Sequence, residues 1–221
     1  MESSIIQDKK LVINSFVANI HFEGWTKKNV YMSFQNNNLD PNLAQVYFPK
    51  GFIDIFQAII TQIDELMKAQ IDHKYLASLK VREKIFYLTK TRILAAKQFK
   101  DALRTGASMF VCPNKLGFGF EILWQSADQI WRIAGDRALD FNYYSKRGLL
   151  SYVYFTTLTY WFEDNSEDTH LTWRFLENKI EQILKIGKVK SNISGIFDQF
   201  KLSRIPVIRY IWAKAKSGSV G

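Results

Sequence analysis

A stretch near the N-terminus decides the fold of this chain: residues 36–63 read NNNLDPNLAQVYFPKGFIDIFQAIITQI. The three asparagines predict a tight turn, because asparagine is among the residues that turns favour. Asp40 suits the N-cap of a short helix, and Pro41 suits its first position because proline lacks an N–H and has a fixed φ. After Gly51, isoleucine and phenylalanine recur at three- and four-residue steps. That spacing predicts a longer amphipathic helix after the short one.

The residues before this stretch predict two more helices. Residues 8–20 form an amphipathic pattern that Gly24 ends, and its apolar face carries Leu11, Val12, Phe16 and Ile20. Residues 26–35 predict a short second helix with Thr26 as its N-cap. Three short helices, a tight turn and a longer fourth helix make a helix-turn-helix arrangement, to which we assign residues 1–60.

The rest of the chain also reads as helical. The 221 residues include only 11 glycines and 4 prolines, and the apolar residues recur at helical rather than alternating spacing. We expect a basic helix over residues 79–104, an aromatic helix over 117–133 that ends near Gly135, and helices over 140–162 and 166–185. The prediction is an all-α protein in which residues 61–185 form a second, helical domain.

The formal net charge of +9 is unevenly distributed along the chain. Residues 1–60 hold five basic and five acidic side chains, whereas residues 185–221 hold eight basic side chains and one acid. The N-terminal residues show no apolar run of signal-peptide length, and the single cysteine, Cys112, cannot form an internal disulfide. These features favour a reducing compartment and an acidic partner for the C-terminal segment.

That segment, residues 186–221, reads as a flexible tether followed by a basic amphipathic helix, which Pro206 is expected to kink. Such helices bind bilayer surfaces by burying apolar side chains and by attraction to anionic lipid. The alternative is a helix packed back on the body. The residues expected to contact an anionic membrane are Ile196, Phe197, Phe200, Lys201, Val207, Ile208, Arg209 and Ile211.

Residues 10–56, and above all the run YFPKG at 47–51, resemble the N-terminal module of TetR-like regulators. The resemblance makes residues 40–48 the recognition helix, which contains no lysine or arginine. Non-specific DNA affinity comes mainly from contacts of those two residue types with phosphate. We therefore expect a helix-turn-helix kept as a scaffold, with no nucleic-acid partner. A TetR-like transcriptional regulator with a lipid-like effector is the alternative function.

No catalytic set is apparent in the sequence. A di-iron site in a helical bundle needs two Glu-x-x-His pairs, and only Glu167 and His170 have that spacing. A solvated loop and helix cap is the simpler interpretation of that pair. No phosphate-binding glycine loop, zinc-protease motif or nucleophile elbow occurs. The protein is predicted not to be an enzyme and to bind no metal or cofactor.

Three further segments carry a more specific pattern: IWRIAGD at 130–136, DFNYYSKR at 140–147 and DTHLTWRFL at 168–176. They look like the C-terminal domain of the ubiquinone-biosynthesis accessory proteins of TetR-like fold, and the resemblance covers residues 80–185. The chain departs from that family at Ala138-Leu139, where members usually carry Ser-Thr, and at Tyr143, where some have tryptophan.

The family resemblance implies a membrane-associated accessory protein rather than an enzyme. Similar proteins are homodimers that bind isoprenoid quinone lipids and present the demethoxyubiquinone intermediate to a separate di-iron hydroxylase. The expected location is cytoplasmic, peripheral on the inner face of the bacterial inner membrane.

By the same resemblance, the hydroxylase-binding patch comprises Ile130, Asp140, Tyr143, Tyr144 and Arg147. Four of these stand at positions i, i+3, i+4 and i+7 of one helix face, and tyrosine and arginine are enriched at interface hot spots. The alternative is a capped helix with a half-buried aromatic stripe and an internal salt bridge between Asp140 and Arg147.

A lipid pocket is expected on the aromatic helices, where apolar side chains alternate with a few polar ones. The alternative is that these side chains are ordinary core. The residues expected to line the pocket are Leu123, Trp124, Tyr152, Phe155, Thr156, Thr159 and Trp173.

Overall fold

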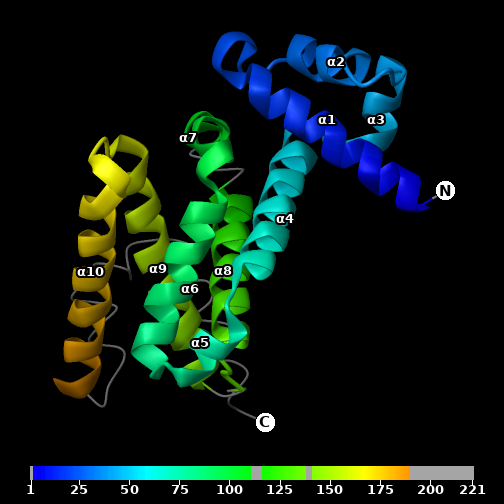
Figure 1. The fold of residues 1–221 in the computed structure, drawn as a ribbon. Coiled ribbons are helices and arrows are strands. Elements are labelled where there is room, and N and C mark those ends of the chain that lie inside the picture. The colour runs from blue at the N-terminus through cyan, green and yellow to red at the C-terminus, as the bar shows by residue number, and fades with distance from the viewer. Residues whose placement is uncertain (1, 111–115, 138–140, 190–221) are drawn as a thin grey trace. The chain divides into compact units, whose positions relative to one another are not determined.

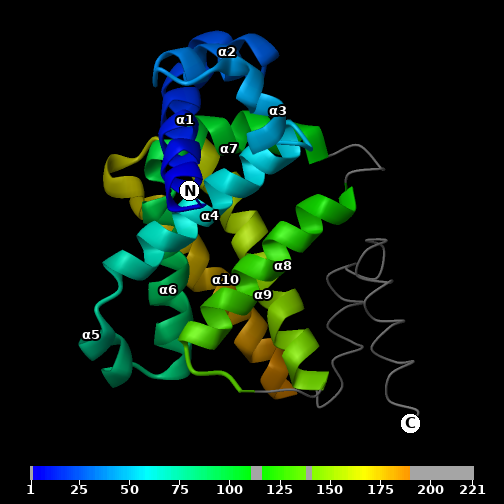
Figure 2. The same ribbon diagram turned by 90° about the vertical axis from the view of Figure 1, so that its right-hand side faces the viewer.

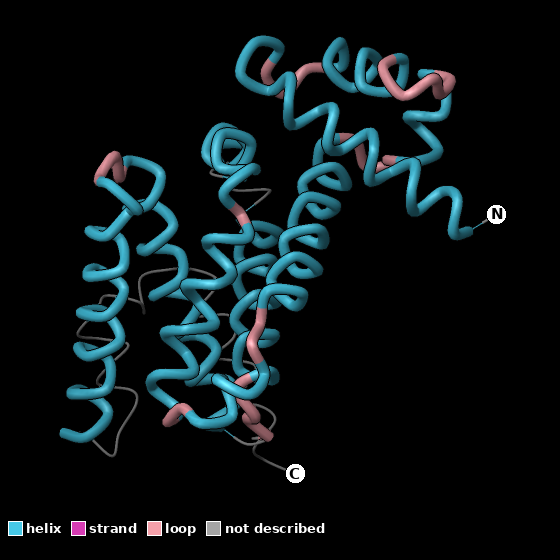
Figure 3. Tube along the Cα trace, in the orientation of Figure 1, coloured by secondary structure: helices cyan, strands magenta, loops and turns pink. Residues whose placement is uncertain are grey.

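The computed structural model describes residues 2–110, 116–137 and 141–189. In this part of the chain every regular element is a helix, so the all-α prediction is confirmed (Figures 1 and 3). The helices form two compact units: unit 1 contains Met1–Ile71 and Thr91–Lys115, and unit 2 contains Asp72–Lys90 and Leu116–Gly221. The eight predicted membrane contacts lie outside the described residues.

The helix-turn-helix order predicted for the start of the chain is confirmed. The elements are α1 (Glu2–Glu23), α2 (Lys27–Gln35), the 3-10 helix η1 (Pro41–Leu43), α3 (Ala44–Tyr47) and α4 (Phe52–Gln70). Thr26 accepts a hydrogen bond from the backbone N–H of Asn29, and Asp40 accepts one from that of Asn42, so both predicted N-caps form. The expected recognition helix is thus a 3-10 turn followed by a single α turn.

The basic helix predicted over residues 79–104 is wrong, because it is broken after its fourth turn. The elements there are α6 (Val81–Ala95), η2 (Lys97–Phe99), α7 (Lys100–Ala107) and η3 (Ser108–Phe110). At the break the N–H of Ala96 is shared between the carbonyls of Arg92 and Ile93, 3.1 Å from each. Ala96 and Phe99 are buried, and no glycine or proline marks the change. A further short helix, α5 (His73–Ser78), was not predicted.

Unit 1 is held together by aromatic packing around Trp25. Its indole N–H donates to the carbonyl of Ala102 at 3.3 Å and to the hydroxyl of Thr105 at 3.2 Å, and its ring meets Phe16 edge-on at 5.1 Å. A Cβ placed on Gly106 would lie 2.6 Å from the ring of Trp25. Only glycine therefore fits where α7 passes this ring.

Unit 2 contains the remaining long helices: α8 (Leu116–Ile133), α9 (Phe141–Glu163), η4 (Glu167–Thr169) and α10 (His170–Val189). These bounds confirm the predicted helices over 117–133 and 140–162, and α8 and α9 lie side by side (Figure 2). The helix predicted to end at residue 185 continues to Val189, into residues that we expected to begin the tether.

One buried carboxylate joins α9 to α10. The side chain of Asp164 accepts hydrogen bonds from the N–H of Ser166 and from both the N–H and the hydroxyl of Thr172. Burial alone raises the pKa of Asp164, but the hydrogen bonds from Ser166 and Thr172 outweigh it and hold the pKa well below its usual value. The corner between the two helices is therefore set by an ionised side chain.

Candidate functional site

The turn between α8 and α9 brings together the segments that carried the family pattern. α8 ends at Ile133, and Gly135 follows in the turn with a φ of 93°, which glycine adopts without strain. The N–H of Asp136 then returns to the carbonyl of Trp131 at 3.0 Å. This closing bond places the Asp136 carboxylate beside the first turns of α9.

A buried arginine ties the two helices together. Arg147 is 1% exposed, and its Nε donates to Asp128 while one Nη donates to Asp136 at 3.0 Å and to the carbonyl of Tyr143 at 3.2 Å. A charge removed from water in this way is tolerated only when it is paired and hydrogen-bonded. Arg147 thus connects α8, the turn after it and α9.

Two more cations complete this ionic network. Lys146 lies 2.6 Å from Asp136, and Arg132 lies 2.6 Å from Asp128. Burial alone raises the pKa of both carboxyl groups, but the hydrogen bonds from these cations and from Arg147 outweigh it, so both pKa values lie below the usual range. The two acids remain ionised throughout the neutral range.

Above this ionic network lies a surface of three aromatic rings, Trp124, Tyr143 and Tyr144, which we call the aromatic ledge. The ring of Trp124 lies 6.3 Å from that of Tyr143 and 6.1 Å from that of Tyr144, and the two tyrosine rings meet edge-on at 5.1 Å. The guanidinium of Arg147 lies 3.6 Å from the centre of the Tyr143 ring, within cation–π range. Tyr144 is 42% exposed, so the ionic network supports an aromatic surface that water and partners can reach.

The structure changes how the predicted hydroxylase patch is interpreted. Ile130 is fully buried and Arg147 nearly so, hence neither offers a surface in this conformation, whereas Tyr144 does. Within the described residues, the carboxylates that hold Arg147 are Asp128 and Asp136. Asp140, which the alternative interpretation paired with Arg147, lies outside the described residues.

Sequence reasoning missed the two acids that hold this site together. A local signal existed for Asp128, which stands four residues before Arg132, a spacing that favours an ion pair on a helix. For Asp136, the preceding glycine marked only the end of a helix. Its pairing with Arg147 spans a turn and has no local signature.

The seven predicted lipid residues lie on three helices of unit 2. They belong to α8, α9 and α10, and Trp124 is part of the aromatic ledge. The hydroxyls of Thr156 and Thr159 donate to backbone carbonyls one turn earlier, so they are engaged within α9. Phe155 is 50% exposed. The role of this set as a lipid pocket stays a prediction.

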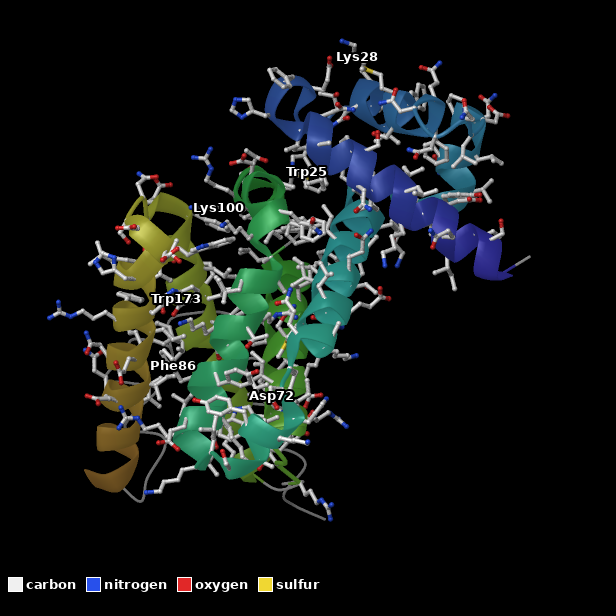
Figure 4. All side chains as sticks on the ribbon, viewed as in Figure 1. Trp25, Lys28, Asp72, Phe86, Lys100 and Trp173 are labelled. Atoms are coloured by element: carbon white, nitrogen blue, oxygen red, sulfur yellow. The ribbon has the colours of Figure 1, made fainter. Side chains whose placement is uncertain are left out.

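Three others of these residues lie in contacts between helices. Lys179 of α10 lies over the ring of Tyr152 at 5.7 Å, next to a stacked pair formed by Tyr160 and Phe175 at 4.6 Å. Trp173 receives Lys90 over its ring at 5.1 Å, on the side of α10 that faces α6 (Figure 4). Leu123 offers its backbone carbonyl to Ser151. Packing within unit 2 accounts for these contacts.

No described group of three or more His, Cys, Asp and Glu side chains is placed to hold a metal ion. A ring nitrogen of His170 lies 3.1 Å from the backbone carbonyl of Glu167, the local arrangement expected of a helix start. Among the described helices, none is both long and apolar enough to cross a bilayer.

In the helix-turn-helix module, the recognition segment carries little that could bind DNA. The amide of Gln45 donates to the carbonyl of Pro49 at 3.2 Å, and the exposed neighbour of Gln45 is apolar, since Val46 is 71% exposed. Of the two side chains suited to reading adenine, one is therefore engaged with the protein's own backbone.

The order of helices and the helix-turn-helix module define a protein of TetR-like fold. A solved TetR transcriptional regulator from Nitrosomonas europaea matches with a TM-score of 0.64 at 16% identity, over 79% of this chain and 96% of that one. The predicted fold class is thus confirmed.

Within that class, residues 117–187 match the COQ9 family, which confirms the resemblance drawn from residues 130–176. The human mitochondrial ubiquinone biosynthesis protein COQ9 is 25% identical over 179 residues, covering 78% of this chain and 56% of the human protein. The probable Dictyostelium discoideum counterpart is 28% identical over 199 residues, covering 87% of this chain and 62% of its own. The chain spans somewhat over half the length of these relatives, and both carry the word mitochondrial in their names.

Proposed function

We propose that this chain is a non-enzymatic, membrane-associated accessory protein of ubiquinone biosynthesis. It binds isoprenoid quinone intermediates and presents them to the di-iron demethoxyubiquinone hydroxylase, as a homodimer at a membrane surface. The pathway comes from the names of its relatives, and the location at a bacterial inner membrane remains an expectation.

The aromatic ledge is the observation that carries this proposal. It lies within the segment that matches the COQ9 family. Its exposed ring, Tyr144, packs against Tyr143, and the guanidinium of Arg147 contacts the Tyr143 ring. A rigid aromatic side chain contributes contact area at little cost in conformational entropy, which is why tyrosine is enriched at hot spots. Arg147 supports this surface rather than contacting the partner.

Binding of purified hydroxylase to the full chain tests the partner. Tyr144→Ala is expected to raise the dissociation constant by about tenfold or more, which is the cost of losing a hot-spot side chain. Tyr31→Ala is the matched control, because Tyr31 is 52% exposed in unit 1, remote from the COQ9-like segment in sequence. Equal affinities for the two variants would show that the aromatic ledge is not part of the interface.

Native mass spectrometry of the purified full chain tests the ligand. An isoprenoid quinone that copurifies and is displaced by an added quinone analogue supports the lipid-binding role. A chain that carries no lipid and binds none of the added analogue contradicts it.

A second function, lipid-responsive transcriptional regulation, is favoured by one observation: the helix-turn-helix module is completely formed, with both N-caps in place. Its neutral charge and short recognition segment argue against tight DNA binding. A gel-shift titration at low salt decides between the two, since submicromolar duplex affinity would favour the regulator.

A further inference from the structure

The helix that sequence reasoning missed, α5, and the start of α6 build a corner of unit 2. Asp72 caps α5 by accepting hydrogen bonds from the N–H groups of Lys74 and Tyr75, at 2.9 and 3.0 Å. Glu83 caps α6 by accepting one from the N–H of Lys80 at 2.8 Å. Figure 4 marks Asp72 at this corner. Both carboxylates are thus held in place by backbone N–H groups.

Two apolar side chains project from the corner. Tyr75 is 51% exposed and Val81 is 59% exposed. The Tyr75 ring rests edge-on against Tyr87 at 5.3 Å, and the hydroxyl of Tyr87 accepts a hydrogen bond from the N–H of Asp72. Leu76, the next residue of the same helix, is buried and anchors it. Tyr75 is therefore held in place with half of its surface in water.

Three lysines stand near these apolar side chains in the sequence. Lys74 and Lys80 are exposed and Lys84 is half-exposed, and within the described residues none of them forms an ion pair. We call Lys74, Tyr75, Lys80, Val81 and Lys84 the basic tip. Cations around an exposed tyrosine and an aliphatic side chain are the pattern of a surface that rests on anionic lipid headgroups.

The basic tip lies at the end of unit 2 where the described chain stops. Arg82 pairs with Glu181 at 2.6 Å and approaches Glu177 at 3.8 Å, so the first turn of α6 lies beside the second half of α10. α10 ends at Val189, eight residues after Glu181, or about 12 Å along a helix. Figures 1 and 2 show α5 and this end of α10 at the same end of unit 2.

We infer that the basic tip is a second contact with an anionic lipid surface, separate from the C-terminal segment. The inference rests on the proposed membrane association and adds to it a site in the folded body. The basic tip and the described end of α10, after which the C-terminal segment follows in the sequence, lie at the same end of unit 2. Two linked contacts bind more tightly than either alone. Two contacts also fix how the body faces the membrane.

The test is vesicle binding by the full chain, using phosphatidylcholine vesicles with and without phosphatidylglycerol. The double variant Lys74→Glu/Lys80→Glu is expected to weaken binding to the anionic vesicles by about tenfold or more, since each lysine near the surface contributes about a fivefold factor. The matched control is Lys27→Glu/Lys50→Glu, which makes the same change of charge at two exposed lysines of unit 1. Tyr75→Ser tests the apolar part and should also weaken binding, with little change in its dependence on salt.

The outcomes separate the inference from the proposal beneath it. Loss of binding by the basic-tip variants alone, with helical circular dichroism unchanged, supports the inference. Equal binding by the basic-tip and control variants overturns it while leaving membrane association intact. Equal loss on vesicles with and without phosphatidylglycerol overturns the assignment to anionic lipid. A wild-type chain that binds neither kind of vesicle overturns both.

Discussion

The helix-turn-helix module and the α8–α9 hairpin are stabilised in different ways. The module is neutral and gathers aromatic rings around Trp25 and Phe34, whose ring packs against Tyr47 at 5.5 Å. The hairpin instead buries an arginine between two carboxylates and leaves Tyr144 in water. In the hairpin, a buried charged side chain holds an aromatic surface that faces water. In the module, the rings of Phe16, Phe34 and Tyr47 are buried and pack against one another or against Trp25 without such support.

Removing the buried cation Arg147 should cause the largest loss of stability, and it should do so by weakening the α8–α9 hairpin. Arg147→Met leaves Asp128 and Asp136 without their shared partner, and breaking a buried pair typically costs about 3–5 kcal/mol. We expect a loss of about 3 kcal/mol in the free energy of unfolding measured with urea, because Arg132 and Lys146 remain. Arg132→Met, at a side chain that is 67% exposed, should cost much less, because solvent screens a surface ion pair. Similar losses in the two variants would mean that the buried charge is not what holds the hairpin.

The helix-turn-helix module should instead lose stability when the packing around Trp25 is disturbed. Gly106→Ala forces a methyl group against Trp25 and Phe56, at 2.6 and 3.0 Å, and overpacking of this kind costs about 1–3 kcal/mol. Gly117→Ala is the control, because no atom lies within 4 Å of its added Cβ. That change should leave stability unchanged or raise it by up to about 1 kcal/mol, through better helix propensity. Thermal unfolding of the two variants distinguishes these outcomes.

Acid should weaken the hairpin through its two carboxylates. The pKa values of Asp128 and Asp136 are lower in the folded chain than in an unfolded one, so ionisation stabilises the fold above the unfolded pKa, and this stability is lost as pH falls. The free energy of unfolding should therefore decline below about pH 5. The double variant Asp128→Asn/Asp136→Asn should show a shallower decline over the same range in urea titrations. An unchanged slope would assign the acid sensitivity to other groups, such as Asp164.

The smallest expected effect is that of Tyr144→Ala on stability. The side chain is 42% exposed and its ring contacts are at the surface, so its loss should cost less than about 1 kcal/mol. Equilibrium unfolding in urea measures the change. A cost as large as that of Arg147→Met would make Tyr144 a structural residue and would weaken its assignment to an interface.

What the sequence predicted correctly has local causes. The N-caps at Thr26 and Asp40 and the end of α8 near Gly135 depend on a few neighbouring residues, so spacing and residue type are sufficient. The break at Ala96 carried no such signal, because alanine is the best helix former and only tertiary packing interrupts the helix there.

The sequence predicted where the candidate site lies but not which contacts hold it together. The motifs at 130–136 and 140–147 marked the hairpin, yet helical spacing placed Arg147 on an outer face together with Tyr144. A full-length side chain reaches across a turn to Asp128, nineteen residues earlier, and that contact depends on how α8 packs on α9. Burial of a charged side chain is decided by tertiary partners, which periodicity does not specify.

The geometry at Arg147 also has an evolutionary consequence. Its guanidinium uses separate nitrogens for two carboxylates and lies 3.6 Å from the centre of the Tyr143 ring, an arrangement that a lysine ammonium does not reproduce. A single substitution at this position would leave Asp128 and Asp136 without their shared partner, so a protein in which Arg147 alone has changed is expected to be less stable. Among related sequences, Arg147 and its two aspartates should therefore be gained or lost together, and the three positions should covary as one unit.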